Sequence, residues 1–332
     1  MGSKISKISY YLPEIVYDNE QVYKEFPDWP PEKVEQKIGI KTRHIAAKSE
    51  TAVDLAFRAA NLLFEEVDRQ EVDFLILCTQ SPDYFLPTGA CVLQSMLGLK
   101  TTTGAFDFNL GCSGYIYGLA IAKGLINSGV AKKIVLITSE TYSKFIHPKD
   151  KGNKTIFGDG AAASLIEYSE EEKILEFVLG TDGNGMNNLI VPNGAMRNPL
   201  ETDPVEIVDP GGGIHTKNNI YMNGPEIFNF TIKAVPPLVE QTLVKNNITL
   251  ENIDFVVFHQ ANKYMLEYLR QKTKIPAEKF FLDMTETGNT VSATIPIGLE
   301  KAIVNGQIKA GDNVLICGFG VGYSWGATII KF

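Results

Sequence analysis

The sequence is poor in cysteine. Its 332 residues include four, Cys78, Cys91, Cys112 and Cys317. They form no CxxC pair and no cluster with histidine, so the ligand spacing of a metal site is missing. A chain of this length can bury a large core and does not need disulfide bonds for its stability. We therefore predict reduced thiols, a cytoplasmic location and no metal ion.

Long apolar runs and an excess of basic residues are absent as well. No segment reaches the roughly 18–20 consecutive apolar residues of a membrane span, and we expect no signal peptide. The net charge of −8 argues against a nucleic-acid partner, because a phosphate-binding surface needs a dominant positive field. With 44% hydrophobic and 21% charged residues, the composition is that of a globular protein that binds neither nucleic acid nor membrane.

What the chain does contain is a diverged internal duplication. In the first half, a helix predicted over 51–67 leads into a strand over 72–78. In the second half, a helix over 226–245 leads into a strand over 253–259. Both strands are unbroken apolar runs, as expected for strands that are covered on both faces. The repetition of one unit predicts two similar halves.

The similarity continues downstream of these strands. Helices are predicted from 111 to 129 and from 288 to 306, and the strands that follow them cover 133–137 and 313–317. Glycines at the helix ends fit the usual stop signal. Because strands alternate with helices in both halves, we predict parallel sheets with helices packed on their faces.

The predicted fold is therefore α/β, with one half at 1–175 and the other at 176–332. Residues 180–220 are rich in Gly, Asn and Pro and are predicted to be loops that link the halves. A solvated connector is the simpler interpretation of this segment, and a lid is the alternative. In such folds ligands bind where strands end and helices begin.

Cys112 lies at a position of this kind. It stands between Gly111 and Ser113-Gly114, at the start of a predicted helix. The thiolate is the reactive form of cysteine, and a helix N-terminus favours negative charge, so we expect a lowered thiol pKa. The neighbouring glycines allow a substrate carbonyl to approach closely. The alternative is a buried structural cysteine.

His259 and Asn289 occupy matching positions in the second half. His259 ends the strand that corresponds to the one ended by Cys78, and Asn289 begins the helix that corresponds to the one at Cys112. Taken alone, such a histidine is often a core residue, and such an asparagine is often a helix N-cap. Their equivalent places in a duplicated fold favour a catalytic set of Cys112, His259 and Asn289.

Three motifs carry a resemblance to a known family. They are Gly111-Cys112-Ser113-Gly114, His259-Gln260-Ala261-Asn262 and Gly288-Asn289-Thr290. In this order and separation they resemble β-ketoacyl-acyl carrier protein synthase III of the thiolase superfamily. The resemblance implies a thiolase-like, five-layered αβαβα fold with two pseudo-duplicated halves.

The resemblance also implies an acyltransferase that works by decarboxylative Claisen condensation, without a cofactor, in fatty acid biosynthesis or a related pathway. Cys112 would carry the acyl group, whose oxygen the backbone N–H groups of Cys112 and Val321 would hold. His259 Nε2 and the Asn289 amide would both donate to the enolate formed when malonyl-acyl carrier protein loses CO₂. Val321 stands where the family usually has glycine, and a β-branched residue disfavours positive φ.

Coenzyme A or phosphopantetheine thioesters are the implied substrates. The residues expected to bind them are Trp29, Lys37, Leu86, Lys151, Gly224, Phe228, Ala261 and Asn262. Lys37 and Lys151 stand where arginines are usual, which keeps the charge but loses bidentate contact with phosphate. Acyl-CoA and acyl-acyl carrier protein therefore both stay open as acyl donors.

Two protein partners follow from the resemblance. The position of Leu86 closes the acyl pocket of a second subunit, which implies a homodimer. An aromatic residue is common there, so Leu86 leaves room for a longer or branched acyl chain, although simple core variation is the alternative. A basic face for acyl carrier protein is expected at Lys263, Arg270, Lys272 and Lys274, with a solvated helix face as the alternative.

Other functions are weighed against this one. A specialised homologue in secondary metabolism with an unusual acyl donor fits the same motifs. A non-decarboxylating acyltransferase is disfavoured by Asn289, and a catalytically silent scaffold subunit by the intact Cys/His/Asn set. Hydroxymethylglutaryl-coenzyme A synthase needs a catalytic glutamate upstream of the cysteine, and 79–84 contains none.

Overall fold

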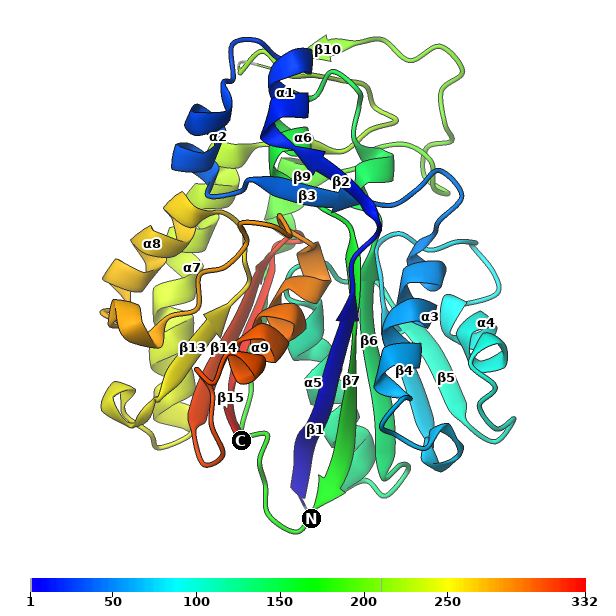
Figure 1. The fold of residues 1–332 in the computed structure, drawn as a ribbon, viewed down its shortest axis with the longest axis vertical. Coiled ribbons are helices and arrows are strands. Elements are labelled where there is room, and N and C mark those ends of the chain that lie inside the picture. The colour runs from blue at the N-terminus through cyan, green and yellow to red at the C-terminus, as the bar shows by residue number, and fades with distance from the viewer. Residues whose placement is uncertain (1, 210) are drawn as a thin grey trace.

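The computed structural model describes residues 2–209 and 211–332. Two sheets form the centre of the molecule (Figure 1). The first has the strand order β1-β7-β6-β4-β5. Its strands are β1 (Gly2–Tyr11), β4 (Phe74–Cys78), β5 (Gly104–Phe108), β6 (Lys133–Glu140) and β7 (Gly160–Ser169).

The second sheet repeats the topology of the first. Its order is β13-β14-β15-β8, with β8 at Val178–Thr181, β13 at Phe255–Phe258, β14 at Asn313–Gly320 and β15 at Ser324–Lys331. In both sheets a central strand, β6 or β14, pairs parallel with an earlier strand, β4 or β13, and antiparallel with the strand that follows it in the chain, β7 or β15. The predicted duplication of two halves is confirmed, whereas the boundary between 175 and 176 stays a prediction.

The expectation of parallel sheets is only partly right. β4 pairs parallel with β5 and β6, and β13 pairs parallel with β14, but β1–β7, β6–β7, β14–β15 and β15–β8 are antiparallel. Parallel neighbours need a long crossover, whereas antiparallel neighbours can be joined by a tight turn. The short connection 321–323 between β14 and β15 is such a turn, and no helix pattern in the sequence precedes β15.

Helices form three layers around the two sheets (Figure 1). α5 (Gly114–Asn127) and α9 (Thr294–Val304) lie between the sheets and contact both of them. α3 (Ala52–Leu63) and α4 (Gly89–Met96) cover the outer face of the first sheet, while α7 (Gly224–Lys245) packs on the second with α8 (Lys263–Lys272) beside it. The predicted five-layered αβαβα order is confirmed.

The α3 and α5 helices illustrate why these segments are helical. Thr51 and Asp54 form a capping box at the start of α3, and the apolar residues of α3 are buried on one face. α5 is buried almost all round because it lies between two sheets, and small residues permit that packing. At Gly118 a Cβ atom would lie 2.6 Å from the side chain of Leu136 on β6.

The remaining elements gather at one end of the sheets, opposite the two termini (Figure 1). They are β2 (Ile15–Asp18), α1 (Asn19–Glu25), α2 (Pro31–Ile38), β3 (Thr42–Ile45), α6 (Lys151–Ile156), β9 (Leu189–Ile190), β10 (Ile207–Val208), β11 (Ile214–His215) and β12 (Tyr221–Met222). Short 3₁₀ helices complete the fold: η1 (Arg69–Glu71), η2 (Tyr142–Phe145), η3 (Gly183–Asn188), η4 (Leu250–Asn252), η5 (Ala277–Lys279) and η6 (Val291–Ala293).

The segment predicted as loops, 180–220, contains only short pieces of regular structure, and Pro210 within it lies outside the described residues. Over residues 2–209 and 211–332, no helix has the length and apolar character that crossing a membrane requires. The same residues contain no group of three or more His, Cys, Asp or Glu side chains that could hold a metal ion.

Two glycine-to-alanine variants test how tightly the halves are packed. At Gly318 on β14, a Cβ atom would lie 2.8 Å from the carbonyl oxygen of Cys112 and 2.9 Å from Cα of Ser113. We expect Gly318→Ala to lower the free energy of unfolding by about 2–3 kcal/mol through this backbone clash. Gly124 in α5 faces open space, so Gly124→Ala should raise the free energy of unfolding by about 0.5–1 kcal/mol.

Urea unfolding of both variants beside the wild type measures these changes. Equal effects of the two substitutions would contradict the close approach at Gly318.

Candidate active site

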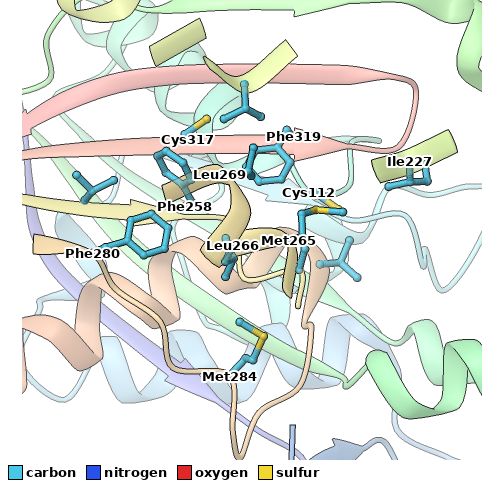
Figure 2. Packing of buried hydrophobic residues seen from close by; sticks show 14 of the residues in the cluster. Cys112, Ile227, Phe258, Met265, Leu266, Leu269, Phe280, Met284, Cys317 and Phe319 are labelled. Carbon is cyan, nitrogen blue, oxygen red and sulfur yellow. The ribbon is translucent and has the colours of Figure 1, made fainter. Parts of the chain in front are cut away.

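Cys112 lies between β5 and α5, against the end of β14. The first helical residue of α5 is Gly114, so the thiol sits just before the helix N-terminus. On β14, glycines make room for it: a Cβ atom at Gly320 would lie 2.7 Å from Cys112 Sγ. Cys112 is 6% exposed and belongs to the same buried cluster as Phe258, Cys317 and Phe319 (Figure 2).

Burial controls the charge of the Cys112 thiol. It raises the pKa of Cys112 to about 12, and the nearby carboxyl of Glu140 acts in the same direction. The backbone N–H groups of Val321 and of Cys112 itself lower this pKa, but not enough to offset burial. The expectation of a low-pKa thiol was therefore wrong, because desolvation outweighs the helix terminus.

Val321 faces the thiol without the backbone strain expected for it. In the described chain, three residues other than glycine have positive φ (Asn247, Lys274 and Val291), and Val321 is not among them; the neighbouring Gly322 has a φ of 138°. The Val321 side chain packs instead against Gly111, where a Cβ atom would lie 2.5 Å from Val321 Cγ1. Its backbone N–H makes a hydrogen bond to the Cys112 thiol.

His259 directly follows β13 and is fixed at both its backbone and its ring. Its backbone N–H donates to the Cys317 carbonyl of β14 (2.8 Å), and ring Nδ1 lies 2.7 Å from the hydroxyl of Thr294. The residue is 2% exposed. Burial lowers the pKa of His259 to about 3, so the ring is neutral at physiological pH.

Asn289 is held by three contacts. Its backbone N–H donates to the Ile156 carbonyl (2.9 Å), and its carbonyl accepts from the N–H of Gly158 (3.0 Å). Its side-chain Oδ1 accepts from the N–H of Val291 (2.9 Å). The helix predicted to begin here starts slightly later, because η6 separates Asn289 from the first turn of α9.

A chain of contacts brings the three residues to one place between the sheets. Gly318 on β14 touches the Cys112–Ser113 backbone, and the preceding residue of β14, Cys317, bonds to His259. On the other side, Ser292 of η6 packs near Gly114 at the start of α5. Thr294, which bonds to His259, begins α9 immediately after η6.

Glu140 is a buried carboxyl beside this site that sequence reasoning missed. It ends β6, is 0% exposed, and accepts hydrogen bonds from Gln80 N–H (3.0 Å), Ser81 Oγ (3.1 Å) and Ser292 Oγ (2.9 Å). Burial raises the pKa of Glu140 to about 8. In the sequence, the feature that could have indicated Glu140 is a charged residue at the end of an otherwise apolar strand.

Thr294 was missed as well, and no local pattern marks it. Its contact with His259 joins positions that are 35 residues apart, and a threonine at a helix start is ordinary. Asp159 has a structural role, because it is buried and accepts from the N–H groups of Ala46 (2.8 Å) and Ser143 (3.0 Å).

Comparison with known proteins decides the family. Residues 106–183 match the model of 3-oxoacyl-[acyl-carrier-protein] synthase III, and residues 243–332 match that of its C-terminal part. β-Ketoacyl-[acyl-carrier-protein] synthase III of Clostridium perfringens is 36% identical over 99% of both chains. The chain belongs to the β-ketoacyl-[acyl-carrier-protein] synthase III family.

Solved structures agree with this assignment. A crystal structure of 3-oxoacyl-(acyl-carrier-protein) synthase III is 48% identical, with a TM-score of 0.98 and full coverage of both chains (100%). The synthase III of Aquifex aeolicus is 33% identical, with a TM-score of 0.86 and 100% coverage of both chains. The prediction of a condensing acyltransferase of fatty acid biosynthesis is confirmed, and the specialised alternatives are not favoured.

Among the residues expected to bind synthase III substrates, the structure brings Trp29 and Lys151 together. Lys151 Nζ lies 5.6 Å from the centre of the Trp29 ring, which Lys33 also approaches at 5.4 Å. Lys151 is paired with Asp28 (2.6 Å). Lys37 is exposed on α2 and joins none of these contacts.

The residues expected on α7 and α8 lie side by side. Gly224 is the first residue of α7, and the Phe228 ring stacks on Tyr264 of α8 (5.6 Å) and meets Tyr268 edge-on (5.3 Å). Ala261 is buried. Asn262 caps α8, because its Oδ1 accepts from the N–H of Met265 (2.9 Å), so its side chain has a structural task.

Leu86 and most of the basic residues are exposed, and none of them takes part in the contacts described around Cys112. Leu86 is 81% exposed, between exposed Phe85 and a cis peptide bond to Pro87. The predicted basic face is uneven. Lys263, Lys272 and Lys274 are exposed, whereas Arg270 is bound to Glu267 (2.9 Å) and to the Ile275 carbonyl (3.1 Å).

Glu140 gives the site a pH-dependent stability. The folded chain keeps the Glu140 proton up to about pH 8, whereas the unfolded chain releases it near the ordinary value of 4.5. Between these values the folded state binds more protons, so the free energy of unfolding falls as pH rises, by up to about 1.4 kcal/mol per pH unit. Glu140→Gln should remove this slope.

Urea unfolding from about pH 5 to about pH 8 tests the slope, with Glu32→Gln, a substitution on the surface of α2, as the matched control. An unchanged pH dependence in Glu140→Gln would contradict a protonated Glu140 in the folded state.

Proposed function

We propose that this synthase III loads an acyl group onto Cys112 and condenses it with malonyl-acyl carrier protein. In loading, the thiol sulfur bonds to the thioester carbonyl carbon, the carbon–sulfur bond of the acyl donor breaks, and the thiol proton leaves with the released thiol. In condensation, the malonyl group loses CO₂, and the resulting carbanion attacks the acyl-cysteine, which frees the Cys112 sulfur.

The observation that carries this proposal is the enclosure of the Cys112 thiol by backbone N–H groups. Those of Val321 and Cys112 already act on the sulfur in the resting protein. When the thioester carbonyl becomes tetrahedral, two backbone donors at this place would hold its oxyanion without having to reorganise. Gly320, which leaves no side chain against the sulfur, keeps that space open.

His259 and Asn289 supply the remaining polar groups. Both are almost fully buried, so their hydrogen bonds act in a medium of low dielectric constant, where a developing charge is stabilised more strongly than in water. Asn289 Oδ1 is occupied by the Val291 N–H, which leaves the Nδ2 hydrogens available to the enolate oxygen formed as CO₂ leaves.

Intact mass spectrometry separates the two half-reactions. Incubation with acyl-CoA or acyl-acyl carrier protein should add one acyl group to the wild type and none to Cys112→Ala. Asn289→Ala should load at a rate close to that of the wild type, yet release CO₂ from malonyl-acyl carrier protein about 100-fold more slowly, by analogy with the loss of one oxyanion donor.

Acylation that persists in Cys112→Ala would exclude Cys112 as the nucleophile. Equal loss of loading and decarboxylation in Asn289→Ala would show that the asparagine holds the site together instead of acting on the enolate.

Acyl carrier protein and a second copy of the chain are the proposed partners. Exposed Lys263, Lys272 and Lys274 offer positive charge to an acidic carrier, whereas Arg270 is engaged within the chain. Tyr84, Phe85 and Leu86 are 62%, 71% and 81% exposed; adjacent large apolar side chains on a surface mark a contact site, which supports a homodimer. The cytoplasmic location stays a prediction from the sequence.

Asp28 is proposed to weaken the use of coenzyme A thioesters. Its carboxylate neutralises Lys151, the cation expected to meet the nucleotide phosphates, and would itself repel them. Asp28→Asn should therefore lower the KM for acyl-CoA about twofold to fivefold, as expected for a solvent-exposed charge pair, without changing the KM for acyl-acyl carrier protein.

Steady-state kinetics with both acyl donors check this prediction, and Glu278→Gln on η5 serves as a control for the change in net charge. An unchanged KM for acyl-CoA in Asp28→Asn would show that Lys151 does not meet the nucleotide.

A further inference from the structure

Two carboxylates and a histidine meet where the hairpin β10–β11 lies against the segment that leads into α6 (Figure 1). Asp209 follows β10, and His215 ends β11. Asp150 caps α6 by accepting from the N–H of Asn153 (3.0 Å). Both carboxylates lie around Gly213, where a Cβ atom would be 3.5 Å from an oxygen of each. None of these groups belongs to the catalytic set.

His215 is placed between the two carboxylates without a hydrogen bond. It is 6% exposed, its ring packs on that of Tyr221 (5.1 Å), and its Nδ1 lies 3.3 Å from Asp209 Oδ2. Among the described residues no group donates to or accepts from this buried Nδ1. Burial and the charge of Asp209 both raise the pKa of Asp150, whereas His215 lowers it. The histidine therefore faces both acids.

No other cation balances these two carboxylates. The lysines on either side of Asp150 are engaged elsewhere, Lys149 by Glu206 (2.8 Å) and Lys151 by Asp28 (2.6 Å). Within residues 2–209 and 211–332, the ion pair of His215 is the only one that either carboxylate forms. Histidine is the side chain that changes charge between about pH 5 and about pH 8. Protonation would make the unpartnered Nδ1 a charged donor between two acids.

The second histidine at this joint works without a change of charge. His147 Nδ1 accepts from the N–H of Lys149 (3.2 Å), so the hydrogen of its neutral ring is on Nε2. That nitrogen lies 3.9 Å from Glu206 Oε1. A further hydrogen bond crosses the joint from the N–H of Ile214 to the Lys149 carbonyl (3.3 Å). The hairpin is thus docked by several contacts, of which that of His215 depends most directly on pH.

Helix α6, on whose start the hairpin rests, connects the outer and inner parts of the site. Its first residue, Lys151, lies over the Trp29 ring (5.6 Å). The carbonyl of its last residue, Ile156, accepts from the Asn289 N–H (2.9 Å). Asp150, which caps this helix, is the carboxylate that the hairpin covers. A change in the docking of the hairpin therefore acts first on Lys151.

We propose that the hairpin β10–β11, hereafter the strap, is a pH-sensitive clasp on the start of α6. Protonated His215 binds Asp209 and Asp150 and holds the strap closed. When the proton is lost, the two carboxylates repel each other and the strap loosens. The closed strap keeps Lys151 beside Trp29, so a coenzyme A thioester binds more tightly at low pH than at high pH. Only this kinetic consequence rests on the proposed function.

Hydrogen exchange measures the strap without any substrate. The Ile214 amide is the reporter, because its hydrogen bond crosses to the segment before α6. After correction for the intrinsic pH dependence of exchange, the wild type should protect this amide about fivefold more at about pH 6 than at about pH 8. His215→Gln should protect it weakly at both. Equal protection of the wild type at the two pH values would overturn the proposal.

Two further variants keep the test decisive if His215→Gln folds poorly. Asp209 is partly exposed, so Asp209→Asn should fold, and it should reduce the difference in protection between the two pH values to less than about twofold. His147→Gln is the matched control and should retain the difference, since His215 is intact. A difference that persists in Asp209→Asn would show that another group titrates, and would overturn the proposal.

Steady-state kinetics then test the link to the acyl donor. From about pH 6 to about pH 8, the KM for acyl-CoA should rise about threefold more in the wild type than in Asp209→Asn, with the same change of kcat in both. Equal changes of KM would overturn the link. If the wild type acquires no acyl group on Cys112, the proposed function fails instead, while the exchange measurements still decide whether the strap responds to pH.

Discussion

The missing side chains of two glycines on β14 are the constraint on which the active site depends. At Gly318 and Gly320, any Cβ atom would collide with the Cys112–Ser113 backbone or with the thiol itself. Neither position has a side chain, so the start of α5 lies directly against β14. The first half of the chain thereby contacts the central strand of the second half. The same strand bonds to His259 through Cys317, so one backbone positions both the nucleophile and the histidine.

This close packing decides the electrostatics of the site. Desolvation leaves the Cys112 thiol, the His259 imidazole and the Glu140 carboxyl uncharged at neutral pH. These three groups are therefore uncharged before substrate binds, and charge develops among them only as bonds are made and broken. The backbone N–H groups of Val321 and Cys112 and the Asn289 amide are oriented beforehand, and such fixed dipoles stabilise a charge where it forms.

The contacts in the outer part of the site are more exposed to water than those around Cys112. Around Trp29, the contacts are made by long, partly exposed lysine side chains and by Asp28, which water screens and which can rearrange at little cost. The residues near Cys112 have no such freedom, because each is buried and bonded to the backbone of another element. The lysines that stand where the family usually has arginines lie in this outer part of the site, which tolerates such changes. Val321, beside Cys112, is the exception.

Local patterns in the sequence determined much of this protein. Unbroken apolar runs marked β4, β6, β13 and β14, the repetition of strand and helix revealed two halves, and the motifs around Cys112, His259 and Asn289 indicated the family. These features are visible because each depends on neighbouring residues. The antiparallel strands, the Thr294 contact with His259, the enclosure of Glu140 and the neutral thiol were decided only by the tertiary structure. They arise from contacts between distant segments and from burial, which removes water that no local pattern records.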